Sequence, residues 1–152
     1  MKTLSMLLIT ISLTVFAQVQ DTASVNLTFN HLALSVKDVD ASVKFYKDIL
    51  NLKEITNKTR IEGIRWSSLG EGKELHLISI LKGNVTINKA VHLALTTSNF
   101  GALIQMLDKM NIAYSDWPGT QKKINIRADG IEQVYFQDPD GYWIEVNSVG
   151  QK

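Results

Sequence analysis

The chain has 152 residues, 45% of them hydrophobic, and a nearly balanced charge of 16 Lys and Arg against 15 Asp and Glu. A chain of this size and composition can bury a core as a single domain, and it contains no cysteine from which to build disulfides. The one local basic cluster is Lys122, Lys123 and Arg127, which is too small to supply the positive surface that dominates nucleic-acid affinity. We therefore expect no nucleic-acid partner.

The N-terminal segment, residues 1–17, has the form of a secretory signal peptide. An early lysine precedes a mostly apolar run, and Val15 and Ala17 occupy the small-residue positions that a signal peptidase reads. The run is shorter than the about 20 residues that a membrane-spanning helix needs. We expect cleavage after Ala17, which leaves residues 18–27 as a linker and residues 28–149 as the domain. The mature protein is then expected to be periplasmic or secreted, without a membrane partner.

The rest of the chain contains an internal repeat. The tetrapeptide HLAL begins at His31 and again at His92, and self-similarity of this kind indicates a tandem architecture. Each copy starts with the alternation of a strand and continues with apolar residues at helical spacing. The candidate residues for capping the helix are Asp38 or Asp40 in the first copy, and Ser98 or Asn99 in the second.

Three strand-like segments follow the helix in each copy. They are residues 52–56, 64–69 and 74–80 in the first copy, and residues 113–117, 133–136 and 142–147 in the second. The sequence DPDG at 138–141 suits a tight turn between the last two, and residues 119–130 are expected to form one long loop, either functional or mobile. The pattern predicts an α+β fold of two tandem βαβββ modules, at about 28–82 and 89–149, forming a cupped eight-stranded mixed sheet with the helices outside.

Alternation along the strands places all three histidines of the chain and one glutamate on the same face. Successive side chains of a strand point to opposite faces, and the aliphatic residues fall on the side that would pack on the helices. The opposite side carries His31, His76, His92 and Glu145. A single histidine in a strand is more often a core residue than a ligand, but two histidines at the same repeat position are hard to explain by packing. Three imidazoles and a carboxylate would suit a divalent zinc, nickel, iron, cobalt or manganese ion.

The repeat opening with NHLALSV and the closing run GIEQVYFQDPDGYWIEV resemble the vicinal-oxygen-chelate superfamily, over roughly residues 28–148. That superfamily includes glyoxalase I, fosfomycin-resistance transferases, extradiol dioxygenases and bleomycin-binding proteins. The resemblance implies that His31, His76, His92 and Glu145 hold a divalent metal, within one chain or across a homodimer. It also implies a small-molecule substrate with two neighbouring oxygens.

Three functions remain open at this point. The first is a metal-dependent lyase or isomerase of the glyoxalase type, with Glu145 as both ligand and general base. His76 weakens it, because many glyoxalase I enzymes have a second glutamate there, and their cytosolic thiol cosubstrate does not suit an exported protein. The second is sequestration of a small molecule, as in bleomycin resistance. The third is oxygen activation at Fe(II), since His31, His92 and Glu145 match the triad of extradiol dioxygenases, although no further histidine remains for acid/base chemistry.

Further residues are expected to contact the substrate. Glu74 is a second candidate base, because it lies two residues from His76. The candidates for substrate binding are Arg65 and Arg127, which would hold an anionic group, and Gln133, Tyr135 and Trp143, with Trp66 and Trp117 as possible pocket walls.

Overall fold

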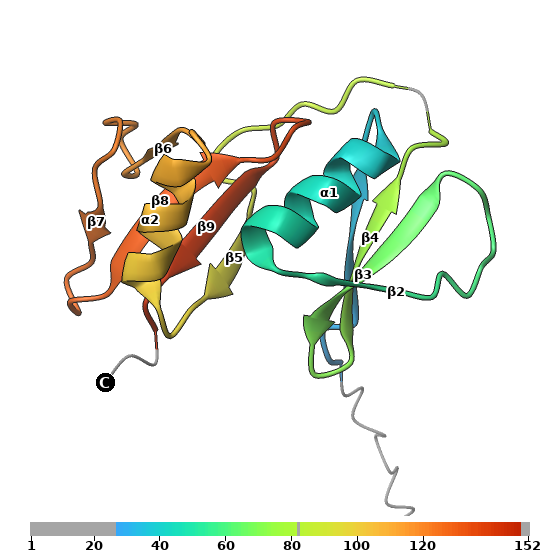
Figure 1. Cartoon of the computed structure of the whole chain (residues 1–152), viewed down its shortest axis with the longest axis horizontal. Helices are drawn as coiled ribbons and strands as arrows, with labels where there is room; N and C mark the ends of the chain where they lie inside the picture. Colours follow the sequence, from blue (N-terminus) through green and yellow to red (C-terminus); the bar gives the residue numbers. More distant parts are fainter. Residues whose placement is uncertain (1–26, 82, 150–152) are drawn as a thin grey trace, which may run out of the picture.

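A computed structural model describes residues 27–81 and 83–149, so the predicted signal peptide lies outside the described residues. In chain order the elements are β1 (His31–Ser35), α1 (Val39–Leu50), β2 (Lys53–Ile55), β3 (Ile64–Gly70), β4 (Lys73–Ile78), β5 (His92–Thr96), α2 (Phe100–Lys109), β6 (Tyr114–Ser115), β7 (Asn125–Ile126), β8 (Glu132–Gln137) and β9 (Trp143–Asn147). The predicted fold class, α+β with tandem βαβββ modules, is confirmed (Figure 1). Neither described helix is long and apolar enough to cross a membrane.

The strands form two sheets of four and five strands, where the sequence predicted one sheet of eight. Sheet A has the order β1-β4-β3-β2, and sheet B has the order β5-β9-β8-β6 with β7 also paired to β8. The additional strand β7 lies inside the predicted long loop, where Asn125 and Ile126 pair with Gln133 and Glu132. The two HLAL strands, β1 and β5, each occupy one edge of their sheet.

The register of the two sheets preserves the duplication. In sheet A, β1 runs parallel to β4 and Ala33 lies opposite His76. In sheet B, β5 runs parallel to β9 and Ala94 lies opposite Glu145. His76 and Glu145 therefore occupy equivalent positions in the two modules.

Helix α1 covers one face of sheet A. Its N-cap is Asp38, whose carboxylate accepts hydrogen bonds from the backbone of the first turn, as the sequence allowed. Val43, Tyr46 and Ile49 form its buried face, and they belong to the same core cluster as the buried Leu75 and Leu77 of sheet A. Helix α2 is capped by Asn99, whose side chain accepts from the Ala102 N–H.

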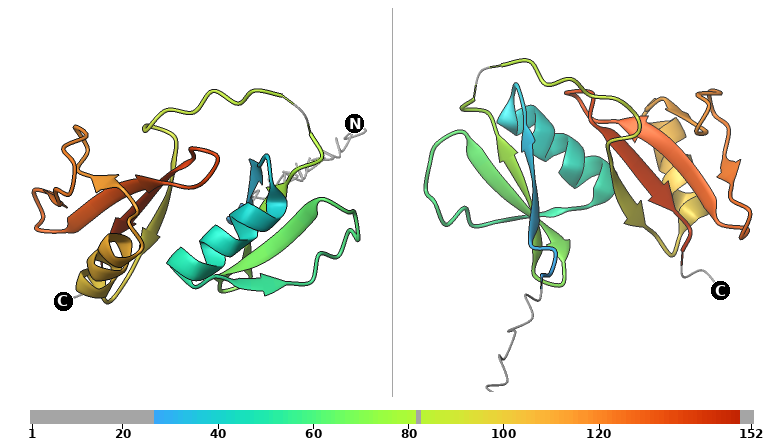
Figure 2. Two further views of the ribbon diagram at one scale, coloured as in Figure 1. Left: turned by 45° about the horizontal axis from the view of Figure 1, so that its top comes forward. Right: turned by 180° about the vertical axis from the view of Figure 1, so that it is seen from behind.

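The second module packs against α1, which lies between sheet A and the second module (Figures 1 and 2). The contact is made by the turn between β8 and β9, in which Gly141 N–H donates to the Asp138 carbonyl at 3.0 Å and Gly141 has a φ of 91°. The Tyr46 hydroxyl donates to Asp138 Oδ2 at 2.9 Å, and the Ser42 hydroxyl donates to Asp140 Oδ2 at 3.2 Å. The second module thus docks on the helix side of sheet A.

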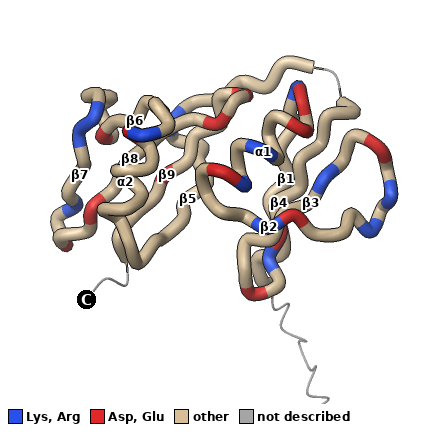
Figure 3. Tube along the Cα trace, in the orientation of Figure 1, with Lys and Arg blue, Asp and Glu red and all other residues tan. Residues whose placement is uncertain are grey.

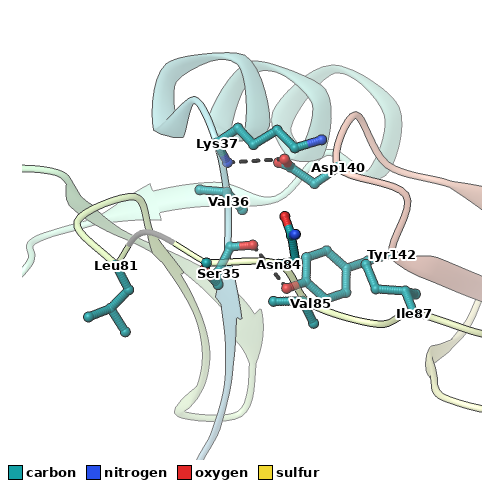
Figure 4. Close-up of a pocket in the computed structure, with 10 residues that line it drawn as sticks. Ser35, Val36, Lys37, Leu81, Asn84, Val85, Ile87, Asp140 and Tyr142 are labelled. Carbon is teal, nitrogen blue, oxygen red and sulfur yellow. Dashed lines mark hydrogen bonds between the residues drawn. The ribbon is translucent and has the colours of Figure 1, made fainter.

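The junction between the modules also contains a half-open cavity of about 370 Å³ (Figure 4). It lies among the end of β1, the linker to β5 and the β8–β9 turn. Two hydrogen bonds between the modules border the cavity, from the Lys37 N–H to Asp140 Oδ1 at 3.0 Å and from the Tyr142 hydroxyl to the Ser35 carbonyl at 2.9 Å.

Acidic and basic residues are interspersed over both modules (Figure 3).

Candidate metal centre

The second module places His92 against Glu145 on the face of sheet B opposite α2. His92 Nε2 lies 3.3 Å from Glu145 Oε2. The other ring nitrogen, Nδ1, donates to the Lys89 carbonyl at 2.9 Å. This bond fixes the proton of a neutral His92 on Nδ1 and leaves the lone pair of Nε2 for a ligand, as is usual for metal-binding histidines.

Glu145 is a buried carboxylate held by several donors. It is 6% exposed, and its Oε1 accepts hydrogen bonds from Gln133 Nε2 at 2.7 Å and Asn147 Nδ2 at 2.9 Å. Its Oε2 accepts from the Tyr135 hydroxyl at 2.7 Å. Burial alone would raise the pKa of Glu145, but the bonds from Asn147, Tyr135 and Gln133, together with the nearby His92, outweigh burial and lower it. An ionised carboxylate in this setting is better suited to bind a cation than to take up a proton.

The neighbouring phenol stays protonated. Burial, followed by the bond to Glu145, raises the pKa of Tyr135 well above its usual range. Tyr135 therefore acts as a fixed hydrogen-bond donor to the carboxylate at neutral pH.

The first module pairs His31 with His76 on the face of sheet A opposite α1. The two rings stack with centroids 4.2 Å apart, and Trp66 stacks on His76 at 4.1 Å. His31 Nδ1 lies 2.7 Å from Asn30 Oδ1, which leaves Nε2 of His31 available. His76 Nε2, in contrast, donates to Glu74 Oε2 at 2.7 Å, so Glu74 must release this nitrogen before it can bind a metal.

The two pairs lie on different modules and do not come together in one chain. Leu75 and Leu77 pack on α1, so the intervening His76 points to the other face of sheet A. The second module packs against α1 through the bond of Tyr46 to Asp138. Across residues 27–81 and 83–149, no three or more His, Cys, Asp or Glu side chains are grouped closely enough to hold a metal ion. One chain therefore holds the four candidate ligands as two separate pairs, which we call the first and the second half-site, where the sequence suggested four side chains in one cup.

The predicted substrate-binding residues divide in the same way. Gln133 and Tyr135 both bond Glu145, and Trp143 shares their face of sheet B because it lies opposite Gln137. Arg65 is not beside the histidines. It lies opposite Leu77, on the helix side of sheet A.

The two predicted arginines have acidic partners near the surface. Arg65 forms ion pairs with Asp40 and Glu54, and the Glu54 bond raises the pKa of Arg65. Arg127 pairs with Asp129 at 2.7 Å. The charge of Arg127 opposes the rise in the pKa of Tyr135, so Arg127 is the predicted arginine nearer to the second half-site.

Lys89 is a site residue that the sequence did not indicate, because it lies in the linker, where no periodicity marks it. Its ammonium donates to Ser115 Oγ, the Asp116 carbonyl and the Trp117 carbonyl at 3.2, 2.5 and 3.0 Å. It also lies 4.6 Å from the ring centroid of Tyr135. Its own carbonyl orients His92, so Lys89 connects the linker to the second half-site.

The donor chemistry of the two half-sites fits a divalent cation. His31 and His92 each keep Nε2 free of a backbone or amide partner, and Glu145 is held ionised. Nitrogen and carboxylate oxygen ligands of this kind suit zinc and its first-row neighbours. On module 1, the buried indole nitrogen of Trp66 has no hydrogen-bond partner among the described residues, so the half-site also holds an unused donor next to His76.

The chain is similar to several known proteins. The chain is 28% identical over 127 residues to the metallothiol transferase FosB of Staphylococcus saprophyticus, covering 80% of this chain and 76% of FosB. It is 25% identical over 125 residues to Glyoxylase I 4 of Arabidopsis thaliana, covering 78% and 69% of the two chains. The solved structure of the oxidase ChaP-H2 matches with a TM-score of 0.68 at 23% identity, over 82% of this chain and 94% of the other.

A sequence profile matches residues 28–146, which include both HLAL strands and all four candidate ligands. The chain belongs to the Glyoxalase/Bleomycin resistance protein/Dioxygenase superfamily.

Proposed function

We propose that the chain is a metal-dependent enzyme of the lyase or isomerase type, acting on a small molecule with two neighbouring oxygens. We further propose that its metal site is assembled from the half-sites of two copies of the chain. The observation that carries this proposal is the placement of two separate and equivalent pairs, His31 with His76 and His92 with Glu145, on the sheet faces opposite the helices of the two modules. Neither pair alone provides the three protein ligands that a catalytic metal usually has.

The edges of the two sheets support association of two copies. β1 and β5 are edge strands, and they carry the two HLAL histidines. Phe29 and Val91, just before these strands, are 56% and 69% exposed. Unpaired strand edges flanked by exposed apolar side chains are typical of surfaces that pair with another chain.

The residues would then have distinct roles. His31, His92 and Glu145 would hold the cation, and His76 would join them once Glu74 releases its Nε2. A bound divalent ion would supply Lewis acidity to two substrate oxygens. Gln133, Tyr135 and Asn147 keep Glu145 ionised and fixed.

Glu74 is the better candidate for the general base in this arrangement. Three donors hold Glu145 and lower its pKa, which weakens it as a base. Glu74 has a single side-chain partner, His76. The sequence ranked these two carboxylates in the opposite order.

The relatives support a metal-dependent enzyme over a sequestering protein. FosB is named a metallothiol transferase and the Arabidopsis relative a glyoxylase I. Oxygen activation would use His31, His92 and Glu145 with Fe(II), so the identity of the metal discriminates between the two enzyme classes. The signal-peptide-like sequence of residues 1–17 supports a separate proposal, that the mature protein is periplasmic or secreted.

Elemental analysis of the purified protein, combined with light scattering, tests this function. We expect dimers with about one divalent metal per chain, loss of the metal in His92→Ala, and retention in the exposed α2 variant Gln105→Ala. A wild-type monomer that binds metal at full stoichiometry would contradict the shared site. A protein that binds no divalent metal would contradict the enzyme assignment.

A further inference from the structure

Trp117 forms an aromatic corner with two residues of the second half-site. Its ring centroid lies 6.3 Å from that of His92 and 5.4 Å from that of Tyr135. Tyr135 and His92 lie 5.7 Å apart at 90°. All three contacts are edge to face, so the rings stand as walls of one corner. Trp117 is its outer wall and is 47% exposed, although the corner adjoins buried Glu145.

The backbone that carries Trp117 is fixed on both sides. The Lys89 ammonium donates to the carbonyls of Asp116 and Trp117. The Asp116 carboxylate accepts from the N–H groups of Gly119 and Thr120 at 3.0 and 2.7 Å. A large aromatic side chain that is exposed on a fixed turn loses little conformational freedom when it contacts a ligand.

The positive charge beside this corner belongs to Lys89, and its hydrogen-bond donors are already satisfied. Each N–H of the Lys89 ammonium has an oxygen acceptor, and its positive charge lies over the rings of Tyr135 and Trp143 at 4.6 and 4.8 Å. Lys89 therefore supports the rings and does not present a free cation to an anionic ligand. A ligand in the corner would therefore contact the faces and edges of the aromatic rings.

We propose that the corner formed by His92, Trp117 and Tyr135 binds a flat aromatic group of the substrate, and that Lys89 is the positioning residue that holds Trp117 for this contact. The proposal deepens the proposed function, because the aromatic group would extend from the substrate oxygens near His92 and Glu145. The corner itself consists of protein rings only, so its binding can be measured without metal.

Calorimetric titration of EDTA-treated protein tests the proposal with two matched probes. The probes are 2-naphthol and its saturated counterpart decahydro-2-naphthol, which keeps the carbon skeleton but has no aromatic face. We expect 2-naphthol to bind at least about tenfold more tightly. Trp117→Leu should remove roughly this tenfold preference, whereas Trp117→Phe should keep 2-naphthol affinity within about threefold. Lys89→Met, with Trp117 intact, should weaken 2-naphthol binding as well.

The control measurements separate this proposal from the metal-dependent function. Trp117→Leu should keep the wild-type metal content and melting temperature, because Trp117 is half exposed and is not a ligand. Equal affinity for the two probes, no 2-naphthol binding, or unchanged binding in Trp117→Leu would overturn the aromatic site. Unchanged binding in Lys89→Met would overturn the role of Lys89. Aromatic selectivity without any bound metal after reconstitution would contradict only the proposed function.

Discussion

Replacing Tyr46 by Phe removes one hydroxyl from the contact between the two modules. Tyr46 is fully buried, and its hydroxyl donates to Asp138 Oδ2 at 2.9 Å across the junction. Asp138 is 5% exposed, and its other oxygen accepts from the N–H groups of Asp140 and Tyr142. The variant therefore leaves one buried carboxylate oxygen without its partner and changes little in shape.

The cost can be worked from this geometry. A hydrogen bond to a charged group contributes about 1.5–3 kcal/mol to stability. The cost of leaving a buried acceptor without a partner lies within that range. We expect Tyr46→Phe to lower the free energy of unfolding by about 2 kcal/mol at neutral pH. For a domain of this size, the melting temperature should fall by about 6–8 °C.

Urea unfolding followed by circular dichroism measures this loss, with Tyr114→Phe as the matched control. Tyr114 is also buried, but its hydroxyl makes no hydrogen bond to another described residue, so its variant should lose less than about 0.5 kcal/mol. Equal losses in the two variants would refute the reasoning, because the effect would then come from the ring environment and not from Asp138.

Three further predictions concern Asp138, Asp38 and Glu145. Burial raises the pKa of Asp138 in the folded protein. Protonated Asp138 therefore stabilises the fold at pH values below the pKa of this group in the unfolded chain. This stabilisation is lost as the pH rises through the pKa of Asp138 in the folded protein. Asp138→Asn should therefore gain stability relative to wild type as the pH rises above about 4 in urea titrations, and a constant difference would contradict this. Asp38→Ala removes the α1 cap and should cost about 1 kcal/mol in the same assay, whereas no loss would mean that the cap is dispensable. Glu145→Gln should lose at least about tenfold in metal affinity by competition with a chelator, because Gln133 and Asn147 would claim its amide oxygen. Unchanged affinity would remove Glu145 from the ligand set.

Local pattern was enough to predict the modules and the faces of their strands. The HLAL repeat located β1 and β5, and alternation placed Leu75 and Leu77 on the helix side. The expectation that Arg65 and Trp66 line the same pocket was wrong on this rule, because neighbours on one strand cannot share a face. The structure shows this separation, with Arg65 opposite Leu77 and Trp66 opposite His76.

The relation between the modules was beyond local pattern. It depends on contacts such as Tyr46 with Asp138, which are far apart in the sequence and carry no periodic signal. The division of the four candidate ligands into two half-sites follows from that docking. Lys89 was not predicted for a similar reason. Its ammonium donates hydrogen bonds to oxygen atoms at the end of β6 and in the turn that follows, which are distant from Lys89 in the sequence.

The shared metal site is tested most directly by complementation between two variants. One carries His31→Ala and His76→Ala, and the other carries His92→Ala and Glu145→Ala, so neither homodimer has a complete site. In a heterodimer purified through two different tags, the intact first module of one copy meets the intact second module of the other. We predict about one metal per heterodimer and almost none in either homodimer. A heterodimer as empty as the two homodimers would contradict a site shared between chains.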